Sequence, residues 1–297
     1  MTQRRTAIAL LVVAVLVVFG TAACSSKAQP ATAQPAAVVP SAASGEPSLP
    51  PESSTPSTSS LAPSVRASRT AGPSGTPKAS AESAFAVRPP GVGSGPAGSR
   101  AHTGSTAVAL TFDDGPDPVN TPKILEVLRA NGVKATFCLV GFRVRDHPEL
   151  VRQIVAGGHT LCNHSWQHLT DLAQRDQTYV DWDLQHTNDM IHAAVGNDVP
   201  IKYFRAPGGN FTADLVAKAQ SMGMAPIYWD VDPQDWNHKN DASDAAHIAR
   251  VIGEVKRQVR QGSIILSHDN VQPDTIVAYQ TLVPFLKRYF TLVALPT

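Results

Sequence analysis

One stretch of the chain decides the fold, Val108-Ala109-Leu110-Thr111-Phe112-Asp113-Asp114-Gly115-Pro116. Its first five residues are apolar or β-branched, which predicts a buried β-strand, and Gly115 and Pro116 end it. Neighbouring side chains of a strand point in opposite directions, so Asp113 and Asp114 can do different jobs at its end. One could hold a metal while the other acts as a base. The alternative is an ordinary strand-to-turn junction, because Asp-Gly-Pro is also common turn chemistry.

Strands and helices alternate along the chain after this stretch. Apolar runs predict seven strands, at residues 108–112, 135–140, 159–163, 203–205, 225–231, 263–267 and 291–295. Amphipathic segments between them predict one helix after each strand but the last, with capping residues such as Thr121, Asp146, Thr212 and Ser243. The alternation implies parallel strands with crossover helices, which indicates an irregular (β/α) barrel with about seven parallel strands. In such barrels the chemistry lies where strands end and loops begin.

Composition divides the chain into three parts. Residues 25–105 hold 13 of the 24 prolines, among many small and polar residues. Such a segment buries too little apolar surface to offset its chain entropy, so we expect a disordered linker there and a single folded domain over residues 106–297. Residues 103–297 carry 17 Lys and Arg against 21 Asp and Glu, without a basic run. That balance argues against nucleic acid as a partner.

The first 24 residues resemble an export signal. Arg4 and Arg5 precede an apolar run over residues 6–19, and Thr21-Ala22-Ala23 stands directly before Cys24. This pattern is similar to a bacterial lipobox, with cleavage before Cys24 and lipid on its sulfur, although Thr21 stands where an aliphatic residue is usual. An uncleaved membrane anchor is the alternative. Either version places the folded domain outside the cytoplasm, lipid-anchored to the cell membrane or secreted.

The other two cysteines form an even pair. If Cys24 is lipidated, Cys138 and Cys162 remain in an oxidising compartment. They fall in predicted neighbouring strands, so we expect that they can form a disulfide. Two small buried hydrophobic side chains are the alternative.

Two histidines follow the third predicted strand. His164 and His168 are four residues apart, so on a helical turn they would share one side and could bind the same metal. Together with one carboxylate from Asp113 or Asp114 they would form a facial site, which leaves positions open for water and substrate. Each histidine alone is more often structural.

Three further strand ends carry polar clusters. They are Arg205 with the glycines that follow it, the segment Asp230–Trp236, and the segment Leu266–Asp269, which contains His268. Any one of these could be a turn or a salt bridge. Five polar clusters at five strand ends are hard to explain as turns alone, and they indicate a single site at one end of the barrel.

These five segments resemble, in the same order, the five motifs of the NodB-like polysaccharide deacetylases, carbohydrate esterase family four. The resemblance covers about residues 107–295 and implies metal-dependent removal of acetyl groups from N-acetylated sugars on an incomplete (β/α) barrel. By motif position the resemblance implies Asp113 as general base, with Arg205 positioning it, and His268 as general acid, with Asp232 as the partner that tunes this catalytic histidine. It implies Asp114, His164 and His168 as metal ligands. Trp236 and Leu266 would form the walls of the acetyl pocket, and the Gly208 N–H would donate to the oxyanion.

Two positions depart from the family pattern, which often has an aromatic residue at Gly208 and usually a glycine at Cys162. They leave the sugar preference open. The resemblance implies one divalent metal ion, for which zinc is the first choice and cobalt, nickel or manganese would fit similarly.

The expected function is deacetylation of N-acetylglucosamine in peptidoglycan or a chitin-like oligomer, by a monomer. The alternatives are an O-acetyl esterase acting on xylan or a similar acetylated polymer, and an inactive carbohydrate-binding lipoprotein. The ligand types alone would also suit a facial iron oxygenase.

Overall fold

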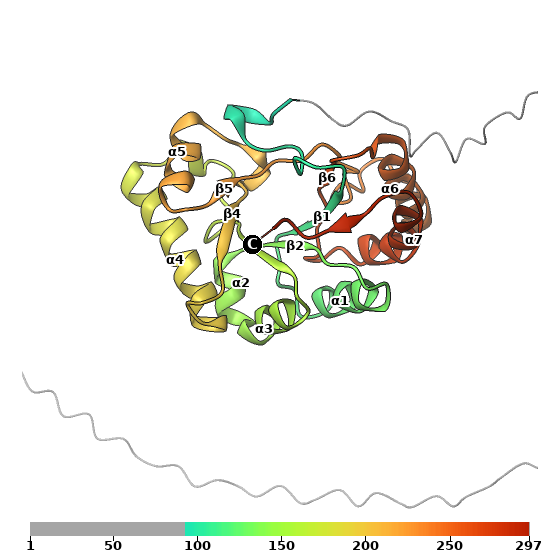
Figure 1. The fold of residues 1–297 in the computed structure, drawn as a ribbon, viewed down its shortest axis with the longest axis horizontal. Coiled ribbons are helices and arrows are strands. Elements are labelled where there is room, and N and C mark those ends of the chain that lie inside the picture. The colour runs from blue at the N-terminus through green and yellow to red at the C-terminus, as the bar shows by residue number, and fades with distance from the viewer. Residues whose placement is uncertain (1–92, 297) are drawn as a thin grey trace, which may run out of the picture. The chain divides into compact units, whose positions relative to one another are not determined.

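Strands and helices alternate throughout the computed structural model, which describes residues 93–296 (Figure 1). None of the helices in this range is both long enough and apolar enough to cross a bilayer. In chain order the elements are β1 (Val108–Asp113), α1 (Asn120–Ala130), β2 (Thr136–Leu139), α2 (Gly141–Asp146), α3 (Pro148–Ala156), β3 (Thr160–Asn163), α4 (Gln177–Val195), β4 (Ile201–Phe204), α5 (Ala213–Ser221), β5 (Ala225–Pro226), α6 (Asp244–Gln258), β6 (Ile264–Ile265), α7 (Pro273–Tyr289) and β7 (Leu292–Val293).

The seven strands form one parallel sheet, in the order β5-β4-β3-β2-β1-β6, with β7 paired to β1. The chain that follows β5 returns to β6 through a parallel bridge between Val231 and Ile265. The sheet therefore curves round on itself, and the helices surround it (Figure 1). This is the irregular (β/α) barrel that the alternation of strands and helices predicted.

The alternation of side chains along β1 positions the first carboxylate. Val108, Leu110 and Phe112 belong to the apolar core that also includes residues of α1, α6 and α7. Ala109 belongs to a separate cluster that is formed mainly by strand residues. Because alternate residues of a strand share a face, Asp113 lies on the same side as Ala109. The strand therefore carries the Asp113 side chain to the end of the barrel interior.

A disulfide joins Cys138 of β2 to Cys162 of β3. The two residues are register partners in the parallel ladder, and both are fully buried in the same cluster as Ala109. Of the two alternatives that the sequence left open, the structure contains the bonded pair. It lies under the strand ends that carry the candidate ligands, because Asp113 is in register with Cys138.

The folded part begins earlier than the sequence predicted. The Arg100 N–H donates to the Pro226 carbonyl oxygen (2.9 Å), and His102 forms an antiparallel bridge with Ser263. The prediction of a linker up to residue 105 is therefore wrong at its end. Pairing of a few residues needs no apolar run, so composition did not reveal it. Residues 1–92, with the rest of the predicted linker and Cys24, lie outside the described residues.

One helix was also missed. The sequence predicted a single helix capped by Asp146, whereas Asp146 is the last residue of α2 and α3 begins at Pro148. The start of α2 packs closely, since a Cβ added to Gly141 would lie 2.4 Å from the Trp166 ring. This helix therefore packs against the loop that carries His164 and His168.

Candidate active site

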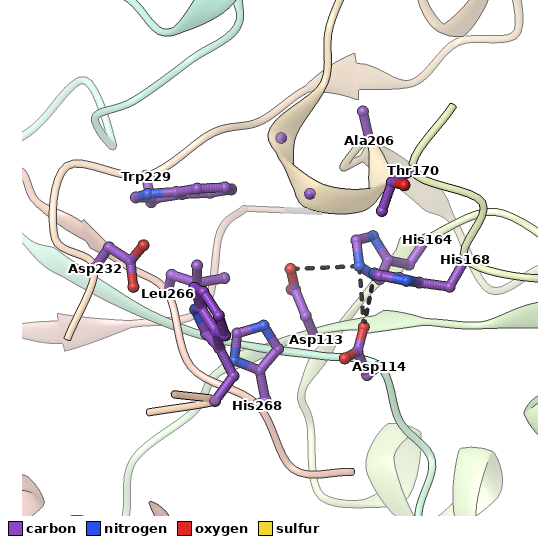
Figure 2. Close-up of a pocket in the computed structure, with 13 residues that line it drawn as sticks. Asp113, Asp114, His164, His168, Thr170, Ala206, Trp229, Asp232, Leu266 and His268 are labelled. Atoms are coloured by element: carbon purple, nitrogen blue, oxygen red, sulfur yellow. Dashed lines mark ion pairs between the residues drawn. The ribbon is translucent and has the colours of Figure 1, made fainter. Parts of the chain in front are cut away.

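The carboxyl ends of the strands surround a cavity of about 460 Å³. Figure 2 shows Asp114, His164 and His168 on one side of it, His268 on the other, and Asp113 between them. The other predicted residues on its wall are Gly208, Asp232, Trp236 and Leu266. Nine of the ten predicted site residues thus line one cavity, and Arg205 contacts Asp113 from its fully buried position.

Three side chains form a compact group suited to a cation. Asp114 Oδ1 lies 3.3 Å from His164 Nε2 and 3.2 Å from His168 Nε2, and the candidate ligand atoms all lie within 4.8 Å of one another. Asp114 Oδ1 is buried and has no hydrogen-bond partner among residues 93–296. Two imidazole nitrogens and one carboxylate oxygen are a donor set that divalent metals accept, with further coordination positions left for water or substrate. The residues therefore fit the expected ion.

The orientation of His164 is set by the neighbouring strand end. Its Nδ1 lies 2.8 Å from the Arg205 carbonyl oxygen, which can only accept a hydrogen bond. Nδ1 therefore carries a proton, and Nε2 is the ring nitrogen that faces Asp114. A hydrogen bond from the second ring nitrogen is the usual way in which a metal-binding histidine is held.

The segment from His164 to His168 is a loop, so the predicted helical turn is wrong. Ser165 and His168 have positive φ angles of 66° and 56°, which L side chains rarely adopt. Side chains hold this backbone in place: Ser165 N donates to Asn163 Oδ1 (2.9 Å), and His168 N donates to Ser165 Oγ (3.0 Å). Both rings reach the same point through these bonds, not through helical spacing.

Electrostatics favour an ionised carboxylate in this group. Burial alone would raise the pKa of Asp114, but the adjacent His164, with the charges of the other site histidines, outweighs burial and holds the pKa far below its usual value. Burial lowers the pKa of His168, and the charge of His164 lowers it further. An anionic carboxylate beside a neutral imidazole is the combination that binds a cation.

Asp113 is held by a buried cation. Arg205 Nη1 donates to Asp113 Oδ1 (2.6 Å) and to Thr111 Oγ1 (2.9 Å), and its Nη2 donates to the Tyr228 carbonyl oxygen. The other carboxylate oxygen, Oδ2, lies 3.6 Å from His164 Nε2 on the cavity side. One oxygen of Asp113 is thus fixed by Arg205, while the other faces the group of candidate ligands.

The partner of His268 is Asp235, and the prediction of Asp232 is corrected here. Asp235 Oδ1 lies 2.8 Å from His268 Nδ1, and Oδ2 accepts from the His268 backbone N–H (2.8 Å) and from Thr275 Oγ1 (2.7 Å). Asp232 Oδ1 instead accepts from Gln234 N (2.8 Å). Both acids lie in the same five-residue motif, and spacing alone did not show which one turns toward the histidine.

Asp235 also sets the charge of the histidine. Burial lowers the pKa of His268, but the charge and hydrogen bond of Asp235, with the charges of Asp114 and Asp113, raise it to about 10. His268 is therefore protonated at neutral pH. A cationic imidazole at the cavity wall can donate a proton to a leaving group.

The apolar wall contains a residue that the sequence did not reveal. Leu266 is 3% exposed and Trp236 is 52% exposed. Trp229 also lies on the cavity wall (Figure 2), with its ring against Gly209. Trp229 was assigned to a strand over residues 225–231, but β5 ends at Pro226. Its ring stacks on Tyr228, with centroids 3.9 Å apart. The one signal in the sequence for a place of Trp229 on the cavity wall was that it is an aromatic residue close to the end of a predicted strand.

Comparison with known proteins agrees with this geometry. The family model described as polysaccharide deacetylase matches residues 100–227. The chain is 36% identical over 210 residues to a chitooligosaccharide deacetylase of Sinorhizobium fredii, covering 66% of this chain and 94% of that protein. It is 31% identical over 188 residues to a peptidoglycan-N-acetylglucosamine deacetylase of Bacillus cereus, covering 61% and 82% respectively.

A solved structure shows the same likeness in three dimensions. The family 4 carbohydrate esterase from Streptomyces lividans in complex with acetate aligns with a TM-score of 0.55 and 34% identity, over 64% of this chain and 91% of that chain. The chain is 36% identical to a relative over nearly that protein's whole length, and it shares a family model and a fold with these proteins. It therefore belongs to the polysaccharide deacetylase family of hydrolases.

Proposed function

We propose that this protein hydrolyses the acetamido group of N-acetylglucosamine units in a cell-wall polysaccharide, peptidoglycan or a chitin-like oligomer. The main support for the proposal is that a carboxylate and an imidazole, those of Asp113 and His268, line the same cavity as the group of Asp114, His164 and His168. Relatives named for chitooligosaccharide and for peptidoglycan N-acetylglucosamine support this class of substrate.

Asp114, His164 and His168 would hold one divalent cation. The unpartnered Oδ1 of Asp114 and the two Nε2 atoms near it support this assignment. A cation bound there supplies Lewis-acid chemistry, which polarises a carbonyl oxygen and lowers the pKa of water. Zinc is our first choice for this ligand set, and cobalt, nickel or manganese would fit similarly.

The chain's own groups supply the proton transfers. Asp113 takes a proton from the attacking water through Oδ2, while Arg205 holds its other oxygen. The Gly208 N–H donates to the oxyanion that forms on the acetyl carbon. His268 then gives its proton to the sugar nitrogen as the C–N bond breaks, and acetate and a free amine leave. Leu266 supplies an apolar surface for the acetyl methyl group.

We also propose that the enzyme acts outside the cytoplasm, attached through lipid on Cys24. Support comes from the charged and apolar start of the chain and from the Cys138–Cys162 disulfide, which suits an oxidising compartment. Cells fed a labelled fatty acid should incorporate the label into the wild-type protein and not into the Cys24→Ala variant. A wild-type protein without label would contradict lipidation.

The function is tested with purified protein on three substrates: N-acetylated chitooligosaccharides, peptidoglycan and acetylated xylan, each with and without a chelator. We expect acetate release matched by new primary amines on the first two substrates, and loss of both with chelator. Acetate from xylan alone would instead identify an O-acetyl esterase. Metal-loaded protein without acetate release from any of the three would identify an inactive carbohydrate-binding protein.

A further inference from the structure

The segment that carries Asp235 has an unusual backbone. Residues 232–241, which we call the acid loop, contain turns but no helix or strand. Gln234 has a positive φ of 52°, and its N–H donates to Asp232 Oδ1. A residue other than glycine keeps this conformation only where the surrounding structure holds it. The acid loop therefore needs external support to present Asp235 to His268.

That support comes from one arginine of α6. The Arg250 guanidinium donates to three carbonyl oxygens of the acid loop, those of Pro233 (2.7 Å), Gln234 (3.2 Å) and Asn237 (2.9 Å). It also donates to the Asp241 carboxylate, at 3.0 to 3.1 Å. The contacts fall on both sides of Asp235, so a single side chain holds the loop before and after it.

His247 adds a second contact from the same face of α6, since it lies three residues before Arg250. It is fully buried, with Nδ1 2.7 Å from Asp241 Oδ2 and Nε2 3.0 Å from the Asp235 carbonyl oxygen. Asp235 is therefore held at its carbonyl by His247, and at its carboxylate by Thr275 and His268.

His247, His238 and Asp274 lie close enough together to suggest a second metal site, but ring geometry speaks against it. The two imidazoles are stacked, with centroids 3.6 Å apart and planes 10° from parallel. Lone pairs in two parallel planes do not converge on one ion, and both nitrogens of His247 already have oxygen partners. The cluster is a support for the loop.

We propose that Arg250 and His247 are positioning residues for the general acid: they hold the acid loop so that Asp235 meets His268. This proposal rests on the proposed function, because its kinetic test measures deacetylation. An arginine suits this task because its planar fork serves several acceptors at once, whereas a lysine ammonium on a flexible stem does not. Charged groups that face His268 are Asp235 and Asp232 of the acid loop, Asp113 at the end of β1, Asp114 directly after it, and His168.

The test compares Arg250→Ala and Arg250→Lys with Arg129→Ala, which removes an exposed arginine paired to Glu126 on α1. We expect R250A to lower kcat on a short chitooligosaccharide about 10-fold, part of the ~100-fold or more that a proton-transfer group contributes. KM and metal content should stay unchanged. The basic limb of the pH profile of kcat, where activity falls at high pH, should move to lower pH, because His268 loses its aligned carboxylate. R250K should behave like R250A, and R129A like the unchanged protein.

A second readout does not depend on activity. The hydrogen-bonded Nδ1–H of His268 should give a low-field proton NMR signal that weakens or shifts in R250A. An unchanged signal and an unchanged basic limb in R250A would overturn the proposal. Full rescue by R250K would overturn the argument from the guanidinium fork.

A milder variant keeps the test decisive if R250A does not fold. Asp241→Ala removes the carboxylate that contacts both His247 and Arg250. Asp241 is the last residue of the acid loop, six residues after Asp235. We expect a smaller shift of the basic limb in the same direction, and no shift would overturn the proposal. If the unchanged protein itself released no acetate, the proposed function would fail, while the NMR signal would still test the loop.

Discussion

The two sides of the cavity are built in different ways. On the ligand side, Asp114 and His164 follow β1 and β3 directly, and His168 comes four residues later. On the acid side, His268 follows β6, but its partner Asp235 lies within a loop that has no regular structure. A side chain directly after a buried strand takes its place from the sheet. A side chain within a loop takes its place from whatever packs against that loop.

The sheet register explains the ligand side. Asp113 is paired with Cys138, and Cys138 with Cys162, so the ends of β1, β2 and β3 lie level. The register places Asp114 and His164 at neighbouring strand ends, and the bonds of Ser165 place His168 beside them. On the acid side, the contacts to Asp235 other than those of His268 come from α6 and α7, through His247 and Thr275.

The largest effect is expected on the ligand side. His164→Ala should abolish stoichiometric metal binding and with it nearly all activity, since it removes one of three candidate ligand atoms. Metal per protein, measured by elemental analysis after dialysis, checks this result. His192→Ala, on α4, serves as the control and should keep its metal. An active, metal-replete H164A protein would refute the ligand assignment.

The proton-transfer groups come next. Asp113→Asn and His268→Ala should each lower kcat at least ~100-fold while metal content stays near that of the unchanged protein. The split between lost rate and kept metal separates these residues from the ligands. Steady-state kinetics on metal-quantified samples provide the measurement. Loss of metal in H268A would mean that the two sides of the cavity are not independent.

A paired substitution tests the corrected assignment. Asp235→Asn should lower kcat roughly 10- to 100-fold, because it removes the charge that stabilises the His268 imidazolium. The Asp235 carboxylate raises the pKa of His268, so its removal lowers that pKa. The fall in activity at high pH should therefore begin at a lower pH in the variant. Asp232→Asn should change kcat by no more than about threefold, because an amide oxygen can still accept from Gln234 N. The opposite ranking in a pH–rate profile would restore Asp232 as the partner.

The smallest effect on rate is expected from the disulfide. Replacing Cys138 and Cys162 together by Ala should leave kcat and the basic limb nearly unchanged, because the bond lies under the ligand side and does not contact the acid loop. The free energy of unfolding should fall by about 3 kcal/mol, since the bond closes a loop of 24 residues' separation. Urea unfolding of both proteins measures the difference. Equal stability would show that the bond is absent from the purified protein.

The sequence by itself determined the alternation of strands and helices, the seven strands, and the residues that directly follow β1, β3 and β6. These features depend on apolar periodicity and on where a buried strand ends, and both are local properties of the chain.

Tertiary structure decided the choice of Asp235 over Asp232, the place of Trp229 on the cavity wall, and the pairing of residues 100–102 with the barrel. Each depends on contacts outside the local pattern. Arg250 and His247 hold the acid loop, the Trp229 ring lies against Gly209, and the carbonyl oxygens of Pro226 and Gly262 accept from the N–H groups of Arg100 and Thr103. Spacing in one sequence carries no information on such contacts, because the loop's conformation is set by the helix on which it rests.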